Sequence, residues 1–178
     1  MIGQEYLRIV VERFNSVKRL GDRTLEQLSE QELHWSPNEE SNSVAIIIKH
    51  MSGNMISRWT DIFTSDGEKE YRNRDDEFID DIASKTALTN VWEQGWQTLM
   101  ATLDGLQEQD LLKSIYIRGE RHIVIEAIER QMAHYAYHVG QMVYIGKQLK
   151  TSNWESLSIP KGKSEEYLQQ KLDQHKNN

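Results

Sequence analysis

The stretch QMAHYAYHVGQMVYIG, residues 131–146, decides how this sequence is read. It contains no proline, and apolar residues recur in it at intervals of three and four, as at Met132, Tyr135 and Val139. That spacing places these side chains on one face of an α-helix. The pattern continues on both sides of the stretch. We therefore predict a long amphipathic helix from about Glu126 to Leu149, with one face buried.

Three further stretches show the same spacing and predict helices over about Gln4 to Leu28, Val44 to Phe63 and Lys85 to Leu106. Ser43 and Ser84 stand directly before the second and third of these, where a serine side chain can cap the first turn of a helix. Four long amphipathic helices in one small domain imply an all-α four-helix bundle, in which each apolar stripe is buried against its neighbours.

The segments outside these helices predict the rest of the organisation. The polar connection over 64–82 is long enough for a crossover, and its acidic part, residues 66–81, is expected to be a solvated loop. Two β-rich runs around a glycine predict a small β-hairpin over 114–125, just before the last bundle helix. The bundle is expected to occupy residues 1–150. We expect residues 151–178 to form a polar C-terminal extension with a short helix from Ser164 to Leu172.

Composition excludes several classes of function. The chain of 178 residues has no cysteine, which rules out disulfides, thiolate metal ligands and a cysteine nucleophile. Its net charge is −7 with no basic cluster, so nucleic-acid binding is disfavoured. The longest apolar run, VAIII at 44–48, is far too short to span a membrane. The N-terminus lacks the pattern of a signal peptide, and we expect a cytoplasmic protein.

The opening stretch also carries two histidines with the spacing of metal ligands. His134 and His138 are four residues apart, which leaves them about 40° apart around a helix and one turn along it. Both imidazoles can therefore point at one atom. The motif is not HExxH, because Tyr135 occupies the position of the general-base glutamate. A zincin-type protease is a poor match.

A third ligand is expected from another helix, and His50 is the strongest candidate. It lies mid-way along the second predicted helix on a partly apolar face, where a polar side chain needs a partner. Three imidazoles leave a coordination position for water or substrate. Nitrogen donors suit zinc, nickel, copper, cobalt or iron. Gln131 and Gln141 flank the pair and could orient a ligand. The other histidines, expected in solvated or local positions, are His34, His122 and His175.

The same residues also fit plainer interpretations. A histidine pair four residues apart is a weak signal on its own, and both rings could lie on the surface. A single histidine such as His50 is more often a hydrogen-bonded core residue than a ligand. Arg58, Trp59 and Tyr137 could line a pocket, although nothing in their spacing indicates one.

Two segments together resemble a known family. LHWSPNEESNSVAIIIKHMSGN, residues 33–54, and HYAYHVGQ, residues 134–141, are similar to the DinB-like metalloenzymes, which include the YfiT-type proteins. The resemblance spans most of residues 1–150. The residues that match the family pattern are Trp35, Pro37, Ser43, His50, His134, His138, Gly140 and Gln141.

The resemblance implies a bundle of up-down-down-up order, a divalent metal at His50, His134 and His138, and a homodimer. Some DinB-like relatives are transferases or isomerases that use small thiols such as bacillithiol, mycothiol or glutathione. Our first hypothesis is therefore a metal-dependent enzyme, with zinc or nickel expected. It would transfer a low-molecular-weight thiol to a small electrophile, or hydrolyse a small molecule through metal-bound water.

Two other hypotheses stay open. One is a non-catalytic, metal-stabilised helical dimer that binds a small molecule or a protein partner. The other is a bundle with three interior polar residues and no metal. The sequence identifies no catalytic residue and no thiol-binding residue, because fold alone does not fix function.

Overall fold

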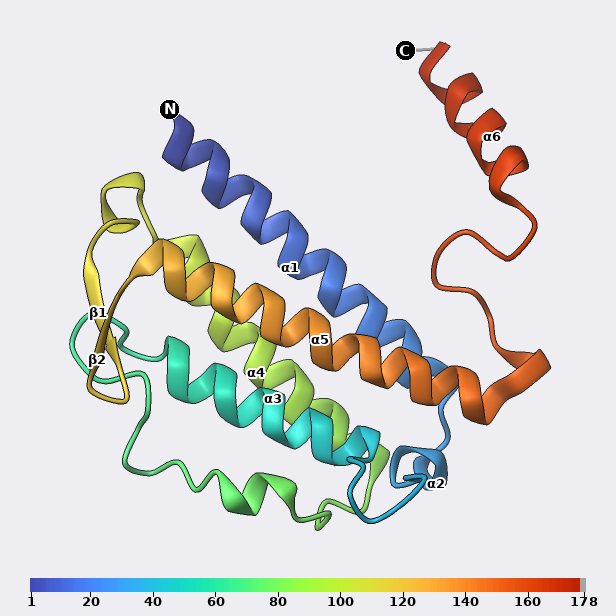
Figure 1. Ribbon diagram of the computed structural model, residues 1–178, viewed down its shortest axis with the longest axis horizontal. Coiled ribbons are helices and arrows are strands. Elements are labelled where there is room, and N and C mark those ends of the chain that lie inside the picture. The colour runs from blue at the N-terminus through green and yellow to red at the C-terminus, as the bar shows by residue number, and fades with distance from the viewer. Residues whose placement is uncertain (177–178) are drawn as a thin grey trace.

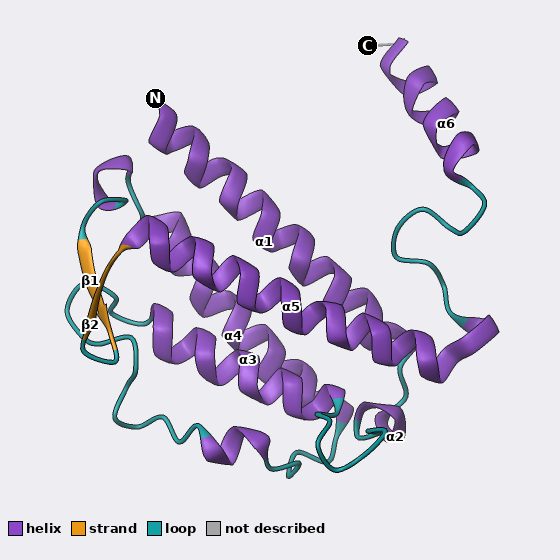
Figure 2. Ribbon diagram, in the orientation of Figure 1, coloured by secondary structure: helices purple, strands orange, loops and turns teal. Residues whose placement is uncertain are grey.

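The computed structural model describes residues 1–176 and consists mainly of helices (Figure 1). The helices are α1 (Ile2–Gln27), α2 (Glu30–Leu33), α3 (Val44–Trp59), α4 (Lys85–Gly105), α5 (Val124–Lys150) and α6 (Ser164–Lys176). Three short 3₁₀ turns are η1 (Asp75–Phe78), η2 (Glu108–Asp110) and η3 (Thr151–Asn153). The strands are β1 (Ser114–Ile117) and β2 (Glu120–Ile123). Figure 2 shows this hairpin between the end of α4 and the start of α5.

The four long helices form a bundle of up-down-down-up order, as predicted. In Figure 1, α1 and α5 run in one direction, and α3 and α4 run in the other. α3 packs chiefly on α4, and α1 packs chiefly on α5. The long connection over 60–84 returns the chain from the end of α3 to the start of α4, so the predicted crossover is present.

Aromatic side chains from several helices meet in the centre of the bundle. Phe14, Trp96 and Tyr135 are fully buried, and the Trp96 ring lies edge-on to the other two. Hydrogen bonds pair several buried polar groups of this core, although Trp96 Nε1 has no partner within residues 1–176. Trp59 Nε1 donates to the Tyr135 hydroxyl at 3.1 Å, and that hydroxyl donates to Asn54 Oδ1 at 3.0 Å.

Local signals position the helix ends. Ser43 and Ser84 each accept a hydrogen bond from the amide three residues further on, so both predicted caps are confirmed. The second bundle helix, however, ends at Trp59 instead of the predicted Phe63. The backbone leaves the helical conformation at Thr60, which is extended with ψ 128°, and the next residue, Asp61, is left-handed with φ 50°.

The hairpin and the C-terminal helix also follow the prediction. β1 and β2 pair antiparallel around Arg118 and Gly119, which both have the positive φ of a tight hairpin turn. α6 begins at Ser164 as expected, continues to Lys176 and buries none of its residues. Figure 1 shows it projecting away from the bundle. Among residues 1–176, no helix is both long and apolar enough to cross a membrane.

Candidate metal centre

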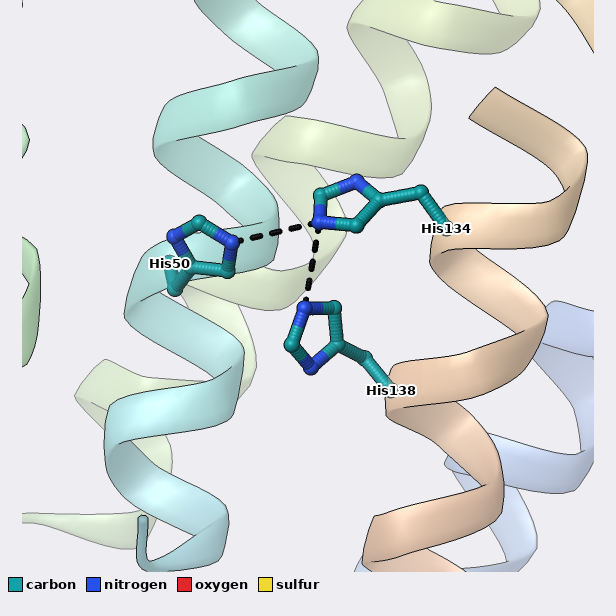
Figure 3. Close-up of side chains that lie close together, drawn as sticks. All are labelled: His50, His134 and His138. Carbon is teal, nitrogen blue, oxygen red and sulfur yellow. Dashed lines mark hydrogen bonds between the residues drawn. The ribbon is translucent and has the colours of Figure 1, made fainter. Parts of the chain in front are cut away.

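The fold brings the three predicted histidines together (Figure 3). His50 projects from α3, while His134 and His138 project from successive turns of α5. His134 Nε2 lies 3.3 Å from His50 Nε2 and 3.1 Å from His138 Nε2. The ligand nitrogens of the group all lie within 4.8 Å of one another. Zinc binds imidazole nitrogen at about 2.0–2.1 Å, so neighbouring ligands of a tetrahedral ion stand roughly 3.3–3.4 Å apart. The spacing therefore fits a divalent ion.

Hydrogen bonds at the other ring nitrogens show which atoms hold lone pairs. His50 Nδ1 lies 2.9 Å from a carboxylate oxygen of Glu77, and His138 Nδ1 lies 2.9 Å from the amide oxygen of Gln141. Both oxygens are acceptors, so each Nδ1 carries the proton and each Nε2 presents a lone pair. His134 Nε2 has one proton at most and can donate to only one of its two neighbours. The convergence of these lone pairs fits a cation among them.

Glu77 corrects the expectation of a solvated loop over 66–81. Its carboxylate is buried in the crossover and accepts hydrogen bonds from His50 Nδ1 and from Arg72 Nε, the latter at 2.7 Å. Burial alone would raise the pKa of Glu77, but the hydrogen bonds from His50 and Arg72 outweigh it and hold the pKa below its ordinary value. Gly53 permits this approach, since a Cβ there would lie 2.2 Å from Glu77 Oε1.

Burial also keeps the histidines of α5 neutral. It lowers the pKa of His134 to about 3, and the neighbouring His138 and His50 act in the same direction. Burial likewise lowers the pKa of His138, against the hydrogen bond to Gln141. Neutral imidazole is the form that binds a metal. Within the described chain, His134 Nδ1 is buried without a hydrogen-bond partner.

A polar cavity of about 220 Å³ opens beside two of the three histidines, His50 and His134. Arg58 is one of its lining residues, although no spacing pattern indicated a pocket there. Trp59 is instead a core residue. Tyr137 lines a separate, larger groove, and Gln141 is another of the residues that line it. The remaining residues around the cavity are Asn54, Arg72, Arg74, Arg118, Arg130 and Gln131.

The comparison with protein families matches residues 1–163 to the family described as "Protein of unknown function (DUF1572)". The chain belongs to the DUF1572 family. No curated protein and no solved structure matches it.

The other histidines of this DUF1572 protein lie outside the cluster. His122, expected in a solvated or local position, is buried in the hairpin and makes a local contact, with Nδ1 3.1 Å from a carboxylate oxygen of Glu126. His34 was also expected in a solvated or local position, but it contacts the distant crossover, with Nδ1 2.7 Å from Asp80 Oδ1. His175 is exposed on α6. The pattern of apolar residues around His122 on a short strand was too brief to indicate its burial.

Proposed function

We propose that this DUF1572 protein binds one divalent metal ion through His50, His134 and His138 and uses it in transfer or hydrolysis of a small molecule. The observation that carries the proposal is the convergence of three imidazole Nε2 atoms while two of the Nδ1 atoms face acceptors. Zinc or nickel is the expected ion. When bound, it would supply a Lewis acid that lowers the pKa of a thiol or a water molecule.

The residues around the histidines have positioning roles. Glu77 and Gln141 hold the rings of His50 and His138 in one orientation and keep their protons on Nδ1. Such outer hydrogen bonds orient a ligand and raise its basicity. The cluster supplies three ligands, and a polar cavity reaches two of them. Structural zinc sites are closed by four protein ligands, whereas catalytic sites keep a position open. This openness favours an enzyme over a purely metal-stabilised dimer.

The proposed reaction class follows from the resemblance to DinB-like metalloenzymes and from the lack of cysteine. A thiol nucleophile must come from a second small molecule, because the chain has no thiol of its own. The thiol sulfur would form a bond to an electrophilic carbon, the leaving group would depart with its electron pair, and the thiol proton would pass to solvent. A homodimer belongs to the same proposal, and a molar mass near twice the 20.9 kDa of one chain would support it.

Elemental analysis of untagged protein purified without chelator tests the metal site. We expect about one divalent metal per chain in the wild type and in the control His175→Ala, whose histidine lies on the exposed α6. The variants His50→Ala, His134→Ala and His138→Ala should lose it. A wild type without metal, even after reconstitution with zinc and nickel, would overturn the proposal.

Turnover of an electrophile tests the chemistry. Metal-loaded protein should conjugate monobromobimane with a low-molecular-weight thiol faster than the uncatalysed reaction, and His138→Ala should not. Full metal content without turnover of any thiol or ester substrate would favour the non-catalytic alternative.

A further inference from the structure

Five arginines surround the cavity beside His50 and His134, and no acidic residue lines it. They come from α3, the crossover, the hairpin turn and α5, so the fold gathers them from distant parts of the chain. They are Arg58, Arg72, Arg74, Arg118 and Arg130. In a chain whose net charge is −7, such a local excess of positive charge is unusual and indicates a site for an anion.

Arg58 is buried and its guanidinium group lacks adequate partners. Its residue surface is only 4% exposed, yet Nε and Nη1 have no hydrogen-bond partner anywhere in the described chain. Its nearest ion-pair contact joins Nη2 to Glu68 Oε2 at 3.8 Å. Burying a guanidinium without partners is costly, and arginine keeps its charge even where burial lowers its pKa, as it does here. A ligand oxyanion would supply the missing acceptors.

The nearby carboxylates are already engaged. Glu68 is shared with Arg72 at 3.2 Å and with Arg118 at 3.1 Å, in addition to its distant contact with Arg58. The carboxylate of Glu77 already contacts Arg72 and His50. These two carboxylates are therefore shared among three of the five guanidinium groups.

The last two arginines stand at the exposed rim. Arg130 makes no ion pair within residues 1–176, and Arg74 lies over the ring of Phe78. Both residues are exposed and line the cavity, so a ligand that enters it would meet their guanidinium groups.

We propose that this cavity binds an oxyanion group, a carboxylate or a phosphate, of the molecule on which the metal site acts. The assignment of that molecule as a substrate rests on the proposed function; the anion site rests on the arginines. Because His50 and His134 line the same cavity, one small molecule could reach both the histidines and Arg58. Arginine binds carboxylate and phosphate through paired N–H groups, which would fix the orientation of such a molecule.

Calorimetric titration with inorganic phosphate, and separately with malonate, tests the site in metal-loaded and chelator-treated protein. We expect saturable binding of at least one anion, weakened about tenfold or more in Arg58→Met and more mildly in Arg130→Gln. Arg130 is exposed on α5, so its variant keeps the test valid if Arg58→Met fails to fold. Arg121→Gln is the matched control, because Arg121 is exposed on the hairpin and does not line the cavity.

The outcomes separate this inference from the proposed function. Stronger binding of phosphate would identify a phosphorylated ligand, and stronger binding of malonate a carboxylate. Metal uptake without saturable anion binding, or equal affinity in Arg130→Gln and the wild type, would overturn the anion site and leave the metal function standing. Arginine-dependent anion binding in a protein that takes up no metal would support the anion site and overturn the metal function.

Discussion

Glu77 links the histidine cluster to the arginine-lined cavity through a single buried carboxylate. It accepts hydrogen bonds from His50 and from two nitrogens of Arg72. Glu77→Gln removes the charge and directs an amide N–H₂ group toward one of these donors. We expect metal affinity to fall about 10- to 100-fold, as is typical when an outer hydrogen-bond partner of a ligand is lost. Competition with a chromophoric chelator measures this.

Glu70→Gln is the control for that prediction. Glu70 lies in the same crossover but is exposed and lies outside the histidine cluster and the cavity. Its metal affinity should match the wild type. Equal affinity in Glu77→Gln as well would show that His50 needs no carboxylate to hold its ring in place.

Asp66 provides a prediction for pH. Its side chain accepts backbone hydrogen bonds from Glu68, Arg118 and Gly119, and so ties the crossover to the hairpin turn. Burial acts to raise the pKa of Asp66, but these three bonds outweigh it and the pKa is lowered. A carboxyl whose pKa is lower in the folded state stabilises the fold above its unfolded pKa, and this contribution is lost as pH falls through the folded pKa.

Asp66→Asn should therefore reduce the free energy of unfolding at neutral pH by roughly 1 kcal/mol. The difference between variant and wild type should shrink as the pH falls below about 4, the usual pKa of aspartate. Urea unfolding at several pH values measures both effects. A difference that stays constant down to pH 3 would contradict the assigned role.

The residues of the site differ in how far sequence could predict them. The two histidines of α5 were recognisable as a pair because residues four apart in the sequence lie on the same face of an α-helix. Glu77 and Arg72 were not, because the crossover has no periodicity and their partner His50 lies in another segment. Their roles depend on long-range contacts that no local pattern encodes.

At the scale of elements, the contact between α3 and α4 depends on Gly95. A Cβ at this position would lie 2.7 Å from the Cα of Ser52, a backbone atom that cannot move aside easily. Gly95→Ala should therefore destabilise the fold by about 1–3 kcal/mol through overpacking, despite the better helix propensity of alanine. Chemical denaturation measures the change.

Gly140→Ala is the matched control, because Gly140 also lies within a helix but a Cβ there would meet no atom within 4 Å. Alanine at this position should stabilise the protein by up to about 1 kcal/mol. If both variants gained stability, the close approach of α3 and α4 would not limit packing.

The helices themselves were predictable to within about two residues at most of their ends, because amphipathic spacing and serine caps are local signals. The end of α3 was not, since no local sequence signal marks the extended Thr60 and the left-handed Asp61 that follow the helix. α2 was missed because four residues are too few to show a period.

At the scale of the whole molecule, the histidine cluster lies between the two halves of the bundle. α3 packs mainly on α4 and α5 mainly on α1, while His50 on α3 faces His134 and His138 on α5. A metal ion bound to all three would link these halves and would bind the folded state alone. Free metal at 100 times its dissociation constant would then stabilise the fold by about 2.7 kcal/mol.

For a chain of this length, that stabilisation raises the melting temperature by roughly 5–10 °C. Scanning calorimetry of metal-loaded protein before and after a chelator measures the shift. The melting temperature of His134→Ala should be the same with added metal and with added chelator, because this variant lacks the central ligand of the cluster. A wild-type protein that carries metal but melts unchanged after the chelator removes it would mean that the ion does not join α3 to α5. The bundle would then owe its stability to its apolar core alone.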